Sequence, residues 1–177
     1  MLKSTLLIVS SIVGLGWISD WVLVEDKRAG FSLAFPVQPN IKQDSLDAGI
    51  GLSYTKTMTA SVGDGNDARI YLANFTAYPE SMDLNDKDST GYYLCQTIIE
   101  QISGQLENSE ILYNQPTSIN SVPTQIASIR YGVDSSIVRM ALFMHKNKLM
   151  SLQYYSPAET GMSKDAEKFF YSCKMMD

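Results

Sequence analysis

A strand that is apolar on both of its faces is the feature that most constrains the fold of this chain. Residues 136–144 carry four apolar side chains on one face and two on the other, namely Val138, Met140, Leu142 and Met144, and Ala141 and Phe143. A strand of this kind has to be covered on both sides. The next strand pattern, residues 148–156, follows after only Lys146 and Asn147, a spacing typical of a tight hairpin. The sequence therefore predicts an antiparallel sheet enclosed between two layers.

Further strand patterns precede this hairpin. Phe31, Leu33 and Phe35 alternate with small residues, which is typical of a half-buried strand, and Pro36 ends it. The remaining predicted strands cover residues 21–24, 52–62, 68–78 and 125–131. Turns are expected at residues 63–67, which are rich in glycine and aspartate, and at residues 119–123.

Two helices complete the predicted architecture. The first begins near Asp88 or Ser89 and has one apolar stripe at helical spacing, formed by Leu94, Cys95, Ile98, Ile99, Ile102 and Leu106. Ser163 caps the second, whose apolar face consists of Ala166, Phe169, Phe170 and Cys173. Strands, helix, strands and helix in this order predict an α+β fold, an antiparallel sheet flanked by helices in an α/β/α sandwich.

The first residues of the chain point to export. An apolar run over residues 6–18 follows Lys3 and is shorter than the roughly 20 residues of a membrane-spanning helix. Gly14 and Gly16 supply the small residues that signal peptidase requires. We interpret residues 1–16 as a signal peptide and residues 17–177 as one domain, periplasmic or secreted, with no membrane insertion after cleavage. An uncleaved anchor or a first buried strand is the alternative interpretation.

The charge of the chain argues against nucleic acid as a partner. The 19 acidic side chains outnumber the 14 basic ones, which gives a formal net charge of −5. An acidic chain repels phosphate backbones, and no cluster of lysine and arginine is present in the sequence to override this repulsion.

The two cysteines, Cys95 and Cys173, leave two alternatives open. In an oxidising compartment they could form a disulfide that closes a long loop. Both lie on apolar faces of predicted helices, so they could equally be small buried hydrophobic residues. The sequence cannot show whether their Cα atoms lie within about 7 Å, as a disulfide requires. Without a CxxC spacing, the pair predicts neither a redox site nor a zinc site.

Motifs for catalysis and for metal binding are not found in the sequence. His145 is the single histidine and lies beside the predicted hairpin, where a solvated turn residue is expected. No nucleophile elbow, zinc-protease motif or phosphate-binding loop is present. The acidic segment 86–91 has Thr97 where a calcium loop needs glutamate, so this segment and residues 64–67 are interpreted as capping and turn residues. We expect no catalytic residue, no metal and no cofactor.

Two pairs of adjacent tyrosines are the candidate interaction surface: Tyr92 with Tyr93, and Tyr154 with Tyr155. Adjacent aromatic residues cannot both point into one core layer, so at least one of each pair is expected to face outward. Exposed tyrosine favours protein interfaces because it contributes contact area at little cost in entropy. The alternative is that these tyrosines lie half-buried along the sheet with their hydroxyls in water.

Several segments resemble the PsbP-like superfamily. Residues 30–36 followed by Pro39 are similar to its opening G-F-S-hydrophobic-x-F-P-x-x-P motif, and residues 148–154 resemble one of its late strands. Residues 169–173 resemble its closing F-x-x-S-F helix, with Cys173 where phenylalanine is usual. The resemblance implies the fold shared by the photosystem II extrinsic subunit, a Ran-binding import factor and exported bacterial proteins of unknown role. It implies protein binding and carries over no catalytic residue.

The sequence thus favours a non-enzymatic exported protein that binds another envelope protein. The alternative is a carrier of a small apolar ligand, because nine methionines, several of them on the late strands and last helix, could line an adaptable cavity. An enzyme is a third hypothesis, and it would require His145 or an acidic pair to converge on a pocket.

Overall fold

The computed structural model describes residues 21–47, 51–82, 84, 89–161 and 163–176. The expected signal peptide and its cleavage site, together with residues 86–88 of the acidic segment, lie outside the described residues. The described strands are β1 (Val22–Asp26), β2 (Phe31–Phe35), β3 (Asn40–Asp47), β4 (Leu52–Val62), β5 (Arg69–Ala77), β6 (Glu110–Ile119), β7 (Val122–Tyr131), β8 (Ser136–His145), β9 (Lys148–Ser156) and β10 (Lys174–Met175). The described α-helices are α1 (Ser89–Gln105) and α2 (Lys164–Ser172).

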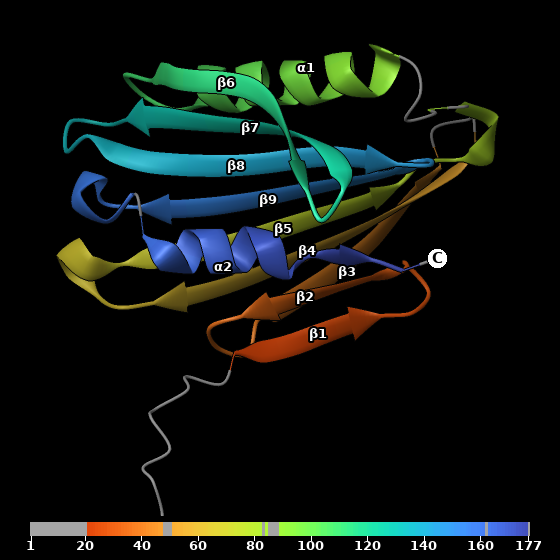
Figure 1. Ribbon diagram of the computed structural model, residues 1–177, viewed down its shortest axis with the longest axis horizontal. Coiled ribbons are helices and arrows are strands. Elements are labelled where there is room, and N and C mark those ends of the chain that lie inside the picture. Colours follow the sequence, from red (N-terminus) through yellow and green to blue (C-terminus); the bar gives the residue numbers. More distant parts are fainter. Residues whose placement is uncertain (1–20, 48–50, 83, 85–88, 162, 177) are drawn as a thin grey trace, which may run out of the picture.

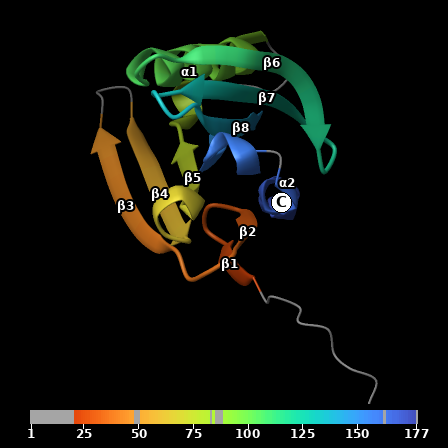
Figure 2. The same ribbon diagram turned by 90° about the vertical axis from the view of Figure 1, so that its left-hand side faces the viewer.

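The strands form two antiparallel sheets (Figure 1). The large sheet has seven strands in the order β3-β4-β5-β9-β8-β7-β6, and the small sheet has the order β1-β2-β10. Figure 2 shows the large sheet curved around α2 and the small sheet, with α1 on the outer face. This arrangement confirms the predicted α+β sandwich, and it explains why β8 is apolar on both faces.

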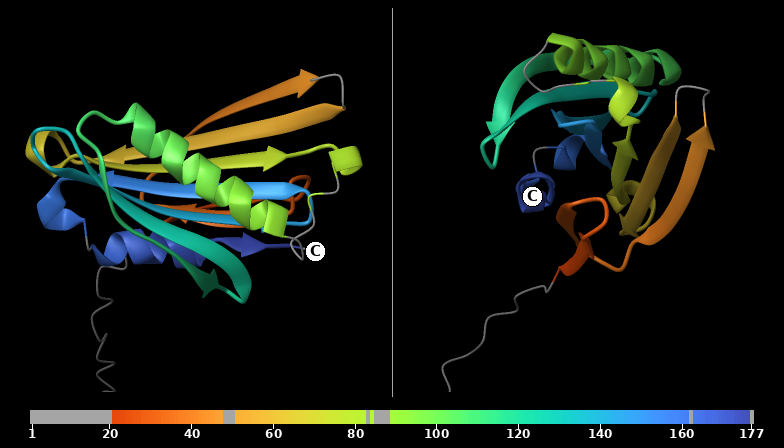
Figure 3. Two further views of the ribbon diagram at one scale, coloured as in Figure 1. Left: turned by 90° about the horizontal axis from the view of Figure 1, so that it is seen from above. Right: turned by 90° about the vertical axis from the view of Figure 1, so that its right-hand side faces the viewer.

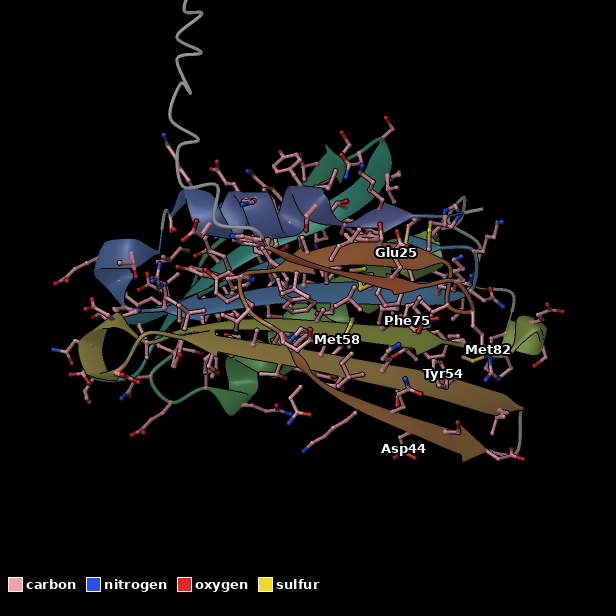
Figure 4. The ribbon with its side chains drawn as sticks, turned by 90° about the horizontal axis from the view of Figure 1, so that it is seen from below. Glu25, Asp44, Tyr54, Met58, Phe75 and Met82 are labelled. Atoms are coloured by element: carbon pink, nitrogen blue, oxygen red, sulfur yellow. The ribbon has the colours of Figure 1, made fainter. Side chains whose placement is uncertain are left out.

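The inner face of the large sheet carries an aromatic core. Tyr71 is central to it, because its ring centroid lies 5.1 Å from that of Tyr154, 5.4 Å from that of Phe169 and 5.7 Å from that of Trp21. Seen from below, Met58 and Phe75 lie in this layer between the small sheet and the large one (Figure 4). We call this core the inner cluster; it unites the apolar faces of β2, β4, β5, β9 and α2.

The outer face carries a second, separate core. The predicted stripe of α1 packs with Cys95 and Ile99 onto β7 and β8, where Ile129, Val138 and Met140 are buried. We call this core the outer cluster. The two clusters are separated by the sheet itself, since alternate side chains of each strand point to opposite faces.

Both predicted turns of the late strands are confirmed. Lys146 and Asn147 connect β8 to β9 between the paired residues His145 and Lys148, and Lys146 has a φ of 55°. Asn120 and Ser121 connect β6 to β7 with φ values of 49° and 67°. Positive φ at both Asn120 and Ser121 is typical of a hairpin turn whose twist matches that of the flanking strands.

Two long strands, β3 and β6, were not predicted from the sequence. They are the two edges of the large sheet. Most described side chains of both strands are exposed, so neither has the alternation that marks a strand with one buried face. Pro116 lies within β6, which an edge strand tolerates because one side of its backbone has no neighbour to bond.

Candidate functional site

Helix α1 covers only part of the outer face of the large sheet. It packs on β7 and β8, while the outer face of β3, β4 and β5 extends beyond it (Figure 3). Where this uncovered part meets the helix, a groove of about 460 Å³ runs between α1 and the strands β5 and β9. We call it the outer groove.

One wall of the outer groove is apolar. Ile98, Ile102 and Leu106 follow one another at intervals of one helical turn and line the groove along α1 and the residue that follows it. Leu72 lines the opposite side, on β5. All four side chains are half-buried, so they present apolar surface to the groove without being enclosed by the protein.

The floor of the groove is polar and internally hydrogen-bonded. The hydroxyl of Tyr155 donates to Oε1 of Gln153 at 2.6 Å, and Nε2 of Gln153 donates to Oγ of Ser151 at 3.1 Å. On the neighbouring strands, Oγ1 of Thr57 donates to Oδ1 of Asn74 at 2.9 Å. These bonds hold the donors and acceptors of the floor in defined positions, which is favourable for binding because less order has to be imposed on association.

The groove is electrically neutral. Its described lining contains no Asp, Glu, Lys, Arg or His. Burial raises the pKa of Tyr78 and of Tyr155, whose hydroxyls therefore stay protonated at neutral pH. General acid–base catalysis needs a group whose pKa lies near the working pH. The groove is therefore equipped to bind a ligand and has no such group in its described lining.

The predicted tyrosine surface is divided by the fold. Tyr92 and Tyr93 are exposed on α1, with 47% and 64% of their surfaces accessible, and their ring centroids are 5.8 Å apart. Tyr155 lines the outer groove. Tyr154 is fully buried in the inner cluster, so its assignment to an interaction surface is wrong. The reason is that β9 is a central strand whose inner face is covered by the small sheet and α2.

The two cysteines are free, buried thiols, so of the two alternatives left open by the sequence the disulfide is not formed and the buried hydrophobic residue is found. Cys95 belongs to the outer cluster and Cys173 to the inner cluster, so the large sheet lies between them. Burial raises the pKa of the Cys95 thiol to about 11 and that of Cys173 to about 12. Both thiols are therefore protonated at neutral pH and act as small hydrophobic side chains.

His145 is half-buried, whereas a solvated turn residue was expected. Its Nε2 atom is buried and has no hydrogen-bond partner in the described part of the chain. Among the same residues, no group of three or more His, Cys, Asp or Glu side chains could hold a metal ion. None of the described helices is long and apolar enough to cross a membrane.

The sequence matches no model of a known protein family, and no curated protein is significantly similar to it. The structure, by contrast, is similar to that of cyanobacterial PsbP (CyanoP) from Synechocystis sp. PCC 6803. The TM-score is 0.53 at 10% sequence identity, over 94% of this chain and 99% of that chain. A Pseudomonas aeruginosa protein of unknown function matches 84% of this chain and 91% of its own, with a TM-score of 0.43 and 13% identity.

The similarity to CyanoP shows that this chain has a PsbP-like fold. It confirms the fold implied by the resemblance of residues 30–36 and 169–173 to the superfamily motifs. At this level of identity the likeness shows the fold alone.

Sequence reasoning missed the outer groove, although one signal was present. Ser151 and Gln153 alternate along β9 with Met150, Leu152 and Tyr154, so one face of a central strand is polar. Ser151 and Gln153 are buried, and a polar face on a central strand indicates a surface that is not packed as an apolar core. The groove lies there because α1 packs on β7 and β8 and does not extend over β5.

Proposed function

We propose that the protein is an exported, non-enzymatic binding module that binds another protein of the cell envelope through the outer groove. The observation that supports this proposal is the groove itself, in which an apolar wall lies beside a neutral, hydrogen-bonding floor. Protein interfaces combine a buried apolar centre with about one hydrogen bond per 100–200 Å². Export is supported by the apolar run over residues 6–18.

The shape of the groove favours an amphipathic helix of the partner. The groove runs beside α1, and the wall residues Ile98, Ile102 and Leu106 form a ridge at helical spacing. A second helix could lie beside α1 on the sheet and pack its apolar stripe against this ridge. Its polar flank would then face the half-buried polar side chains of the floor, including Asn74 and Thr76.

The methionines that pointed to a carrier of apolar ligands have a structural explanation. Met58, Met140 and Met150 are at most 1% exposed and pack within the two clusters. Their flexible side chains fill irregular gaps between aromatic and branched residues. The proposed protein-binding function therefore has the stronger support.

Site-specific photocrosslinking in intact cells tests the proposal. A photoreactive amino acid in place of Leu72, on the wall of the groove, should crosslink to one protein. That protein should be recovered in an amount close to that of the tagged chain. The matched control carries the same amino acid at Val133, which is 85% exposed in the turn between β7 and β8 and does not line the groove. Equal products from both positions, or none from Leu72, would refute the groove as the binding site.

A further inference from the structure

A second cavity, of about 220 Å³, is lined by residues of α2, of the β6–β7 hairpin and of β8. The curved hairpin and α2 themselves can be followed in Figure 2. Nδ2 of Asn120 holds the hairpin against the helix end by donating to the carbonyl oxygens of Tyr171 and Cys173, at 2.9 Å and 2.7 Å. We call it the inner cavity, and its principal lining residues are Tyr113, Thr117, Ile119, Ile126, Arg139 and Phe170. The inner cavity lies on the opposite face of the sheet from the outer groove. An inference about its ligand therefore does not depend on the function proposed above.

Arg139 is the unusual member of this lining. It is a half-buried cation on the central strand β8, and none of the ion pairs between described residues involves it. Its Nε atom is buried and has no acceptor in the described part of the chain. Arg69 and Arg130, by contrast, are paired with Asp165 and Glu110. Removing a charged donor from water without supplying an acceptor costs free energy. A buried arginine nitrogen of this kind therefore indicates a place where a ligand could supply the acceptor.

The orientation of the guanidinium group defines what the missing acceptor would be. Nη1 is directed to the carbonyl oxygen of Gly161 at 3.4 Å, and the group lies 5.8 Å from the ring centroid of Phe170. The edge formed by Nε and Nη2 makes no hydrogen bond within the described residues. Two parallel N–H groups on one edge match the two oxygens of a carboxylate.

We infer that the inner cavity binds a compact organic acid whose carboxylate pairs with Arg139. The apolar body of the acid would lie among Ile119, Ile126 and Phe170. Tyr113 and Thr117, which carry hydroxyl groups, belong to the same lining. Because Nε is buried, the arginine side chain would have to rotate to present both Nε and Nη2 to the carboxylate. A cavity of about 220 Å³ limits the ligand to a small molecule.

Glu167 provides an internal test of this inference. It lines the cavity from α2 and is exposed, so it lies at the rim. Its carboxylate repels an incoming anion, and its replacement by neutral glutamine should strengthen binding. An apolar ligand without charge would be insensitive to this change.

The experiment is a titration of the full chain with benzoate and with neutral benzamide, followed by NMR chemical-shift changes. Benzoate should shift resonances of the cavity lining, and benzamide should not. Arg139→Gln should weaken benzoate binding about ten- to a hundredfold, because a charge-assisted hydrogen bond contributes about 1.5–3 kcal/mol and 1.4 kcal/mol corresponds to a factor of ten. Glu167→Gln should tighten it.

The matched control is Arg130→Gln, which removes the same charge from an exposed position paired with Glu110. This variant should bind benzoate as the unmodified chain does. Equal binding of benzoate and benzamide, or equal losses in Arg139→Gln and Arg130→Gln, would overturn the inference. If Arg139→Gln does not fold, Arg139→Lys keeps the charge but loses the planar fork, and unchanged benzoate affinity in that variant would also overturn the inference.

Discussion

At the scale of single residues, the ion pair between Asp26 and Lys56 connects the two sheets. Nζ of Lys56 on β4 lies 2.5 Å from Oδ2 of Asp26 on β1, and both side chains are largely buried, with 8% and 11% exposed. Burial by itself raises the pKa of Asp26, but the hydrogen bonds from Lys56 and from the backbone of Ala29, together with the lysine charge, lower it below its ordinary value of 3.8.

The lowered pKa of Asp26 predicts acid sensitivity. A carboxylate with a depressed pKa in the folded state contributes stability above its unfolded value, and this contribution is lost as the pH falls through the folded value. The free energy of unfolding should therefore decrease below about pH 4. Urea unfolding at a series of pH values measures the effect. In Asp26→Asn this part of the pH dependence should disappear.

Asp26→Asn should also destabilise the protein at neutral pH by about 3–5 kcal/mol, because it leaves the charge of Lys56 buried without a partner. The double variant Asp26→Asn/Lys56→Met removes both charges and should recover much of the loss. A double variant no more stable than Asp26→Asn would show that the pair itself, not the unpaired charge, accounts for the cost.

The buried thiols predict a second result at this scale. Because burial raises the pKa values of Cys95 and Cys173 to about 11 and 12, few thiolates form at pH 8. A thiol-specific reagent at pH 8 should leave both residues unmodified in the folded protein. In denaturant without a reductant, both should react. If no thiol reacted there, a disulfide would be present after all.

At the scale of elements, Asn147 connects the β8–β9 hairpin to the segment between β5 and α1. Its Nδ2 donates to the carbonyl oxygen of Pro79 at 2.9 Å, and its Oδ1 accepts from the backbone nitrogen of Leu84 at 2.9 Å. Its own carbonyl oxygen accepts from the backbone nitrogen of Tyr78 at 2.8 Å. The turn residue thus helps to position the chain that leads into α1 and the outer groove.

Replacing Asn147 with alanine should destabilise the protein by about 1–3 kcal/mol, since two side-chain hydrogen bonds of about 0.5–1.5 kcal/mol each are lost. Thermal unfolding measures the change. Asn66→Ala is the control, because Asn66 is an exposed residue of the short turn between β4 and β5. Similar destabilisation of the two variants would contradict the connecting role of Asn147.

At the scale of the whole molecule, α1 covers the large sheet unequally and so leaves open the outer groove, where we propose that a partner binds. Leu72→Arg places a charge on the wall of the neutral outer groove, in a half-buried position that reaches solvent. We expect the unfolding temperature of this variant to stay within a few degrees of that of the unmodified chain. The amount of partner recovered with the tagged variant should fall at least tenfold.

The control for this variant is Val133→Arg, which introduces the same charge at an exposed turn outside the groove. It should retain full recovery of the partner. Equal recovery with Leu72→Arg and the unmodified chain would place the interface elsewhere, and the exposed Tyr92 and Tyr93 of α1 would then be the next surface to test.

The sequence by itself determined the elements that have a buried face. The alternation of Phe31, Leu33 and Phe35, the two apolar faces of β8 and the stripe of α1 all arise from contacts with a core, and each pattern was readable for that reason. The edge strands β3 and β6 have no comparable pattern, because their stability comes from pairing with neighbours that lie elsewhere in the sequence.

The positions of the candidate surfaces were decided only by the tertiary structure. The sequence showed two buried cysteines and two tyrosine pairs, but the face of the sheet that each residue occupies depends on strand order and register. Cys95 and Cys173 lie on opposite faces, and Tyr154 and Tyr155 point in opposite directions from one strand. The outer groove and the cavity around Arg139 likewise arise from how far α1 and the β6–β7 hairpin extend over the sheet, a property of packing that no local pattern records.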